Sequence, residues 1–202
     1  MLSHKRLAVV VTSAFAALAL SACTTLSASA TTQPTPGPTQ SGAADSEFGA
    51  GCAAVPTDPN DPASFEAMAK EPVVTALSAN PMFSMFVAAV NKAGLAETLN
   101  NTGNITVFVP TNDAFAKVSA EDLNAVMADQ TVLTQLLSYH VVPEALAPDK
   151  LAGTYQTQTG DNVTITGSGT EFKVNDTAKV VCGNVKTSNA TVYAVDSILL
   201  PS

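Results

Sequence analysis

The sequence is poor in the residues that usually carry out chemistry. Its 202 residues include two histidines, three cysteines and no tryptophan. It has no Gly-x-Ser-x-Gly nucleophile elbow, no cofactor motif and no clustered carboxylates, so we expect neither an enzyme nor a bound cofactor. Basic residues are also scarce, with 9 Lys and Arg against 17 Asp and Glu, and they form no stripe. Because the phosphates of nucleic acids repel an acidic protein, we expect no nucleic-acid partner.

One long apolar run is present, and it lies at the N-terminus. A polar, basic start is followed by Leu7–Leu20, which would span roughly 21 Å as a helix at about 1.5 Å per residue. A bilayer core is about 30 Å thick, so this run is too short to cross a membrane comfortably. It is typical of the apolar core of a signal peptide, to which we assign residues 1–22.

The segment Leu20-Ser-Ala-Cys23 resembles the bacterial lipobox. In that motif the cysteine is acylated on its sulfur and becomes the new N-terminus. Ordinary secretion with an incidental Cys23 is the alternative. We favour lipidation of Cys23, because a free thiol directly after the apolar run has no other evident use. Two or more acyl chains would hold the protein stably at the outer face of the cytoplasmic membrane or at the cell surface.

The two other cysteines are Cys52 and Cys182. Export favours a disulfide between them, and two buried free thiols are the alternative. A bridge would close a loop of about 130 residues and would stabilise the fold by about 5 kcal/mol at most.

The exported chain divides into a tether and one domain. Residues 23–51 are mostly Thr, Ser, Ala, Pro, Gly and Gln, and they cannot bury enough apolar surface to offset the entropy of ordering. We assign residues 52–202 to a single globular domain. Its first half has helical periodicity and its second half has the period of two that strands show, which predicts an α+β fold. We expect helices at residues 61–70, 81–99, 119–129 and 129–143, and strands at 105–110, 154–159, 162–166, 171–176, 178–187 and 190–201.

Two of the expected helices carry clear start signals. Asp61 is the candidate N-cap of the first helix, with Pro62 at its first position. Ser119 caps the helix at 119–129, with Asp122 in the capping-box position.

The stretch Thr106–Val118, TVFVPTNDAFAKV, joins a strand to a helix. Pro110 ends the strand, Thr111 or Asn112 can accept backbone N–H bonds at the start of the helix, and Asp113 complements the positive end of the helix dipole. Each polar residue therefore has a structural task. Three consecutive oxygen-bearing residues also lack the alternating spacing of a calcium loop, so we expect no metal site.

Three segments together resemble the fasciclin (FAS1) domain family: TVFVPTNDAFAKV, LLSYHVVPEAL at 136–146 and ATVYAVDSILLP at 190–201. The resemblance covers residues 62–201. It implies two antiparallel-rich β-sheets packed as a wedge, with helices along one side, and a role in extracellular adhesion or protein binding without catalysis. The lipobox, tether and cysteine pair are similar to those of lipid-anchored and secreted actinobacterial fasciclin antigens, which implies the Cys52–Cys182 bridge. Many animal members carry tandem domains, whereas this chain has one.

The pair Tyr139–His140 lies in the second of these segments, and His140 is the only histidine outside the signal peptide. We expect His140 to hydrogen-bond at the junction between a helix and a strand. Contact with a partner through Tyr139 and His140 is the alternative that the resemblance implies. A zinc site would lack ligands if both cysteines are bridged.

These observations predict a monomeric, non-catalytic cell-surface lipoprotein that binds a protein or another component of the cell envelope. The alternative is an envelope carrier for an apolar small molecule or lipid, with a cleft between the helices and the sheets. Apolar residues in PMFSMFVAAV (81–90) and VLTQLLSYHVV (132–142) motivate that alternative.

Overall fold

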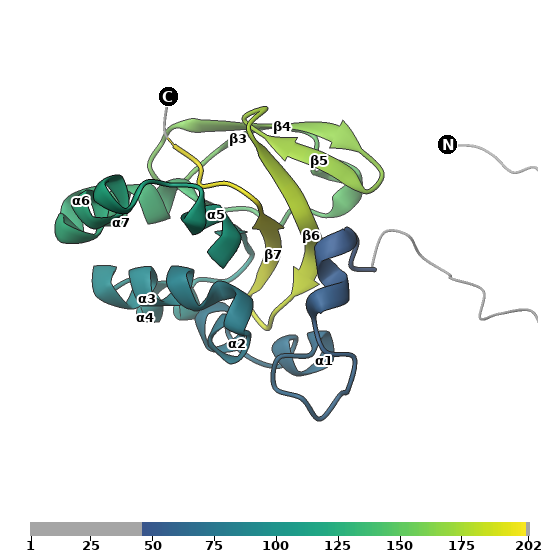
Figure 1. The fold of residues 1–202 in the computed structure, drawn as a ribbon. Helices are drawn as coiled ribbons and strands as arrows, with labels where there is room; N and C mark the ends of the chain where they lie inside the picture. Colours follow the sequence, from purple (N-terminus) through teal and green to yellow (C-terminus); the bar gives the residue numbers. More distant parts are fainter. Residues whose placement is uncertain (1–45, 201–202) are drawn as a thin grey trace, which may run out of the picture. The chain divides into compact units, whose positions relative to one another are not determined.

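The computed structural model describes residues 46–200, so the expected signal peptide, Cys23 and most of the tether lie outside the described residues. The helices precede most of the strands along the chain (Figure 1). The helices are α1 Phe65–Met68, α2 Val73–Ala79, α3 Ser84–Ala93, α4 Ala96–Asn101, α5 Asn112–Ala116, α6 Ala120–Ala128 and α7 Gln130–Tyr139, with 3-10 turns at Ala50–Ala54, Pro81–Phe83 and Pro148–Lys150. The strands are β1 Ile105–Pro110, β2 Val141–Val142, β3 Gly153–Gln156, β4 Asn162–Ser168, β5 Glu171–Val174, β6 Ala178–Lys186 and β7 Ala190–Val195.

The strands hydrogen-bond in the order β2-β1-β7-β6-β5-β4-β3. Strands β1 and β7 run parallel, and every other pair is antiparallel. The α+β, antiparallel-rich fold predicted from the sequence is therefore confirmed. The two expected sheets are continuous through the nine-residue strand β6, which pairs with β5 along one edge and with β7 along the other and has two register shifts.

The alternating side chains of β1 build two separate cores. Ile105, Val107 and Val109 belong to the helix-side core, together with buried residues of α2, α3 and α7. Phe108 points the other way, into the sheet-side core, where it meets buried residues of β4, β5 and β7. Because successive side chains of a strand point to opposite faces, one buried strand separates the two cores. Helices α2 and α3 bury residues in the helix-side core, whereas α7 contributes to both: Leu133 and Leu137 lie in the helix-side core and Tyr139 lies in the sheet-side core.

The N-terminal end of the described chain is fastened to β6. Cys52 and Cys182 form the expected disulfide, with their Cα atoms 4.9 Å apart. Phe48 pairs with Gly183 through two backbone hydrogen bonds, and its ring lies 5.5 Å from that of Phe172 in the sheet-side core. The packed domain therefore begins at least four residues before the boundary expected at Cys52, because Phe48 is the large apolar residue that anchors this segment.

Local sequence signals predicted some of the helix ends correctly and others wrongly. Ser119 caps α6, as its sequence predicts, and its Oγ accepts a hydrogen bond from Asp122 N at 3.1 Å. Ser64, not Asp61, caps α1, whereas the Asp61 carboxylate accepts from Ala63 N and closes the preceding turn. The expected helix at 81–99 is two helices, because Gly94 takes a left-handed conformation with φ of 73° and ends α3.

Two short elements were not expected from the sequence. Helix α2 was not predicted, and its apolar residues lie in the helix-side core. Helix α7 ends at Tyr139, and Val141–Val142 pairs with β1 where we expected the helix to continue.

Among the described helices, none is by itself long and apolar enough to cross a membrane. Within residues 46–200, one pair of helices, Val73–Ala79 and Pro81–Ala93, reaches that length and composition together, but it is bent by 111°.

Candidate functional site

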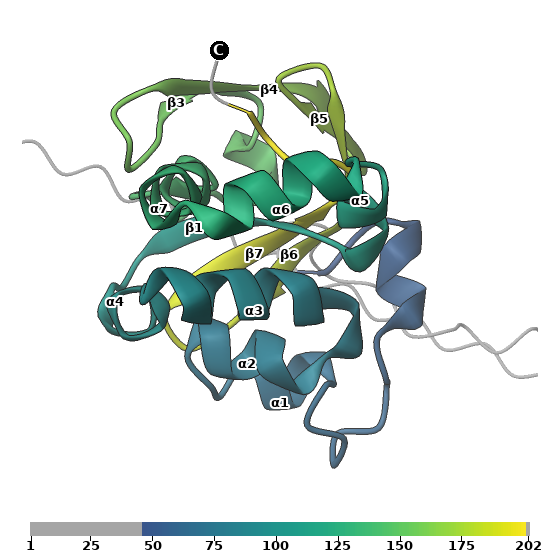
Figure 2. The same ribbon diagram turned by 60° about the vertical axis from the view of Figure 1, so that its left-hand side comes forward.

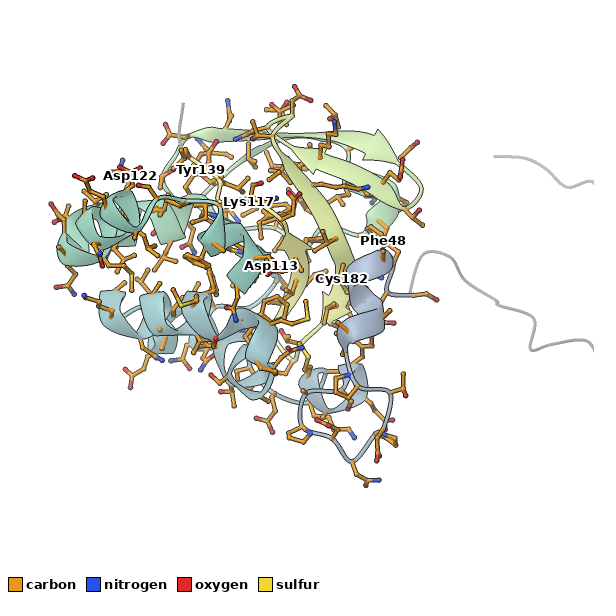
Figure 3. The ribbon with its side chains drawn as sticks, viewed as in Figure 1. Phe48, Asp113, Lys117, Asp122, Tyr139 and Cys182 are labelled. Atoms are coloured by element: carbon orange, nitrogen blue, oxygen red, sulfur yellow. A yellow bond between two sulfur atoms is a disulfide. The ribbon has the colours of Figure 1, made fainter. Side chains whose placement is uncertain are left out.

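Tyr139 ends α7 with a side chain that is fully buried. Its hydroxyl donates a hydrogen bond to the carbonyl of Asn162 at 3.0 Å and accepts one from Asn175 Nδ2 at 2.8 Å. The phenol therefore ties the end of the last helix to β4 and to the turn after β5. In Figure 3, Tyr139 is labelled near the top of the helical layer, close to β3 and β4.

His140 is 1% exposed, and both of its ring nitrogens are engaged. Nδ1 lies 2.8 Å from the carbonyl of Leu136, to which it donates, and Nε2 accepts the backbone N–H of Leu199 at 3.1 Å. Burial lowers the pKa of His140 from 6.5 to about 4, against the smaller opposing effect of the bond to Leu136. The imidazole is therefore neutral at physiological pH and fixed in one tautomer.

This geometry is the helix-end hydrogen bonding expected for His140. It also corrects the interpretation that Tyr139 and His140 themselves contact a partner, because neither side chain reaches the surface. The last turn of α7 is covered by the segment that follows β7, and a single sequence gives no sign of that cover.

The turn at Thr111–Asp113 has the structural role expected from its sequence. Thr111 is the N-cap of α5, and its Oγ1 accepts from Ala114 N at 3.4 Å. The side chain of Asn112 reaches a different helix, where Oδ1 accepts from Met85 N at 3.1 Å and Nδ2 donates to the carbonyl of Pro81 at 2.8 Å. Asn112 therefore links the start of α5 to the start of α3. Among residues 46–200, no three His, Cys, Asp or Glu side chains are grouped so that they could hold a metal ion.

An apolar cavity of about 290 Å³ lies among the helices. Its walls come from α3, α5, α6, α7 and the segment after β7. They include Phe86, Ala89, Phe115, Val118, Leu123, Val126, Met127, Leu133, Leu136, Leu137, His140, Ile198 and Leu200. Figure 1 shows α3 and α6 on the same side of β7, and Figure 2 shows the same helices from a view turned by 60°. The expected cleft between helices and sheets is therefore replaced by a cavity within the helical layer, although both apolar segments named from the sequence contribute to its wall.

The two charged residues that line the cavity, Lys117 and Asp122, are exposed and mark its rim. Lys117, just after α5, forms an ion pair of 3.1 Å with Asp196, and Asp122 lies on α6 (Figure 3). Burial raises the pKa of Asp196, but the backbone N–H of Lys179 and the ammonium of Lys117 lower it more, so the net pKa lies below the usual value. The carboxylate of Asp196 therefore stays charged and holds Lys117 in place.

Comparison with known proteins identifies the family. The model of the fasciclin domain matches residues 81–201. The chain belongs to the fasciclin domain family. It is 42% identical over 165 residues to the immunogenic protein MPB70 of Mycobacterium bovis, covering 79% of this chain and 84% of that protein. It is 40% identical over 160 residues to the cell surface glycolipoprotein MPB83 of the same species, covering 76% of this chain and 72% of that protein.

A solved structure supports the fold of this fasciclin domain. The FAS1 domain pair of the insect cell adhesion molecule Fasciclin I matches with a TM-score of 0.56 and 16% identity, over 66% of this chain. The chain spans about half of that two-domain structure, 52% of its length. At this identity the match shows a shared fold only.

Proposed function

We propose that this protein is an exported cell-surface module that binds a protein or another envelope component and catalyses no reaction. The observation that carries the proposal is the 40% identity to a cell surface glycolipoprotein across most of both chains.

The absence of catalysis is supported by the state of His140. It is the only histidine between residues 46 and 200, and a general base needs a free nitrogen that can reach a substrate. Here Nδ1 donates to Leu136, Nε2 accepts from Leu199, and the ring is closed off from solvent. A reaction that needs an imidazole would therefore have to break the helix end first.

Attachment to the membrane is supported by the lipobox-like segment that ends at Cys23. A diacylated Cys23 followed by the tether rich in Thr, Ser and Pro would hold the monomeric domain away from the bilayer while leaving its surface accessible. The test is cell fractionation of three samples: cells that make the wild-type chain, cells that make C23A, and wild-type cells treated with globomycin. We expect wild-type protein in the membrane fraction and C23A in the medium. If C23A remains membrane-bound, the lipid is not what anchors the protein.

Binding is tested with the exported chain carrying C23A, immobilised and exposed to extracts of the envelope and of host surfaces. We expect at least one protein to be retained and then to bind the purified domain saturably in a direct titration. Domain that has been reduced and unfolded is the control and should not bind. The adhesion proposal fails if no retained protein binds the folded domain more tightly than it binds the unfolded control.

A further inference from the structure

Helix α6 packs against the helix-side core only through side chains that are half-buried. It runs from Ala120 to Ala128 and contains no fully buried residue. Its apolar side chains Leu123, Val126 and Met127 are half-buried and form one wall of the cavity. A surface helix normally buries its apolar stripe against a neighbouring element. In α6 that stripe packs against the helix-side core, but it also lines the cavity and stays half-exposed.

Inside its rim, the described wall of the cavity has no buried side-chain polar atom without a hydrogen-bond partner. Both nitrogens of His140 are engaged, and Ser197 Oγ donates to Asp196. Among the described residues, the buried side-chain polar atoms without a hydrogen-bond partner belong to Asn80 and Asn184, and neither residue lines the cavity. Any group that fills the interior of the cavity must therefore be a hydrocarbon, because a polar group there would lose its hydrogen bonds to water without replacement.

The charges around the cavity limit where a polar group can sit. Lys117 and Asp122 line its rim, and the Lys117 side chain is 54% exposed. One cation and one anion at an open rim leave a polar head in water while the apolar part of the same molecule is buried. This distribution fits an amphiphile better than a wholly apolar ring.

The size of the cavity excludes larger occupants. Its 290 Å³ is roughly twice the ~150 Å³ cavity that holds one benzene, and it lies at the lower end of the roughly 300–1,000 Å³ range of small-molecule pockets. A small ligand is therefore the occupant that fits.

We propose that the cavity beneath α6 binds one alkyl chain of an amphiphile, a fatty acid or the acyl chain of a lipid, with the polar head at the rim between Lys117 and Asp122. Burying the alkyl chain removes it from water and also covers the half-exposed stripe of α6, which is favourable for both. This inference goes beyond the proposed function, and it depends neither on the lipid at Cys23 nor on a protein partner.

The experiment uses the exported chain carrying C23A and the fluorescent fatty acid cis-parinaric acid. We expect saturable binding of one molecule per chain and displacement by decanoic acid. Dioctanoylphosphatidylcholine is the second competitor. Displacement by both compounds indicates a site for lipid acyl chains, and displacement by decanoic acid alone indicates a site for free fatty acids.

Matched variants on α6 test whether the ligand binds in the cavity. In V126W the indole should fill the cavity and weaken binding at least tenfold, whereas N124W, on the exposed face of the same helix, should bind within twofold of wild type. M127D places a carboxylate in the wall and serves as the second variant if V126W does not fold. The proposal is overturned if the wild-type chain shows no saturable binding, or if a folded V126W or M127D binds as tightly as wild type. Neither result would bear on surface attachment or protein capture.

Discussion

Acidification should destabilise the domain through His140. The folded protein keeps this imidazole neutral because it is buried and because Nε2 must accept the N–H of Leu199. Its pKa falls from 6.5 to about 4 on folding. Protonation would remove the acceptor, place a charge in the interior and free the segment after β7.

The sign and the size of the effect follow from that difference in pKa. Above pH 6.5 the ring is neutral in both states, so His140 adds no pH dependence there. As the pH falls from 6.5 towards 4, the unfolded chain binds a proton that the folded chain does not, and the free energy of unfolding decreases. One pKa unit corresponds to about 1.4 kcal/mol, so the full loss is about 3 kcal/mol. Small domains are typically stable by roughly 5–15 kcal/mol, so this loss is large.

Urea unfolding at pH 7.5, 5.5 and 4 measures the loss, and NMR titration of the imidazole measures the pKa itself. H140Q is the control variant: it should be less stable than wild type at pH 7.5 and should lack the decrease between pH 6.5 and 4. Asp196 does not confuse the result, because its pKa is lowered below 3.8 and its stabilising contribution is lost only at lower pH. A pKa of His140 near 6.5, or an equal decrease in H140Q, would refute the reasoning.

Three further changes test the fold around the site. The double variant C52S/C182S should lower the free energy of unfolding by up to about 5 kcal/mol in urea, since the bridge joins residues separated by 130 positions; an unchanged value would mean that the bridge adds no stability. G183A should be destabilising, because its Cβ would collide with the ring of Phe48, and in an F48A background the same substitution should cost much less; equal costs in both backgrounds would rule out the collision. N112A should lower stability by about 1–2 kcal/mol in thermal or urea unfolding, because α3 loses a cap supplied from α5; a change within error would show that this link is not needed.

The sequence predicted those parts of the fold that depend on neighbouring residues. Ser119 and Thr111 cap their helices as their positions indicate, and strands rich in Val, Thr and Ile lie close to where the period of two placed them. Helix α1 starts at a different cap than expected because Asp61 and Ser64 are both good N-caps, and only the fold selects between them. Val141 and Val142 leave the helix because β1 offers them hydrogen bonds, which is information from residues far away in the chain.

The candidate site was predictable only in part, for the same physical reason. The pairing of Asn112 with the start of α3 crosses 27 positions, and the bond from Leu199 to His140 crosses 59, so no local pattern signals either one. Apolar residues that line a cavity also have the same spacing as those that fill a core. Whether Val126 and Leu136 meet another side chain or an open space is decided by the packing of four helices.

The proposal that this domain works by binding, with the cavity beneath α6 as one of its sites, is tested best by a methyl NMR titration with decanoic acid. We predict saturable shift changes at the methyl groups of Val126, Met127, Leu136 and Ile198, none at Val163 in the sheet-side core, and recovery of the acid unchanged. Shift changes that are absent, or that are as large in the sheet-side core as around α6, would contradict it, and so would chemical conversion of the acid.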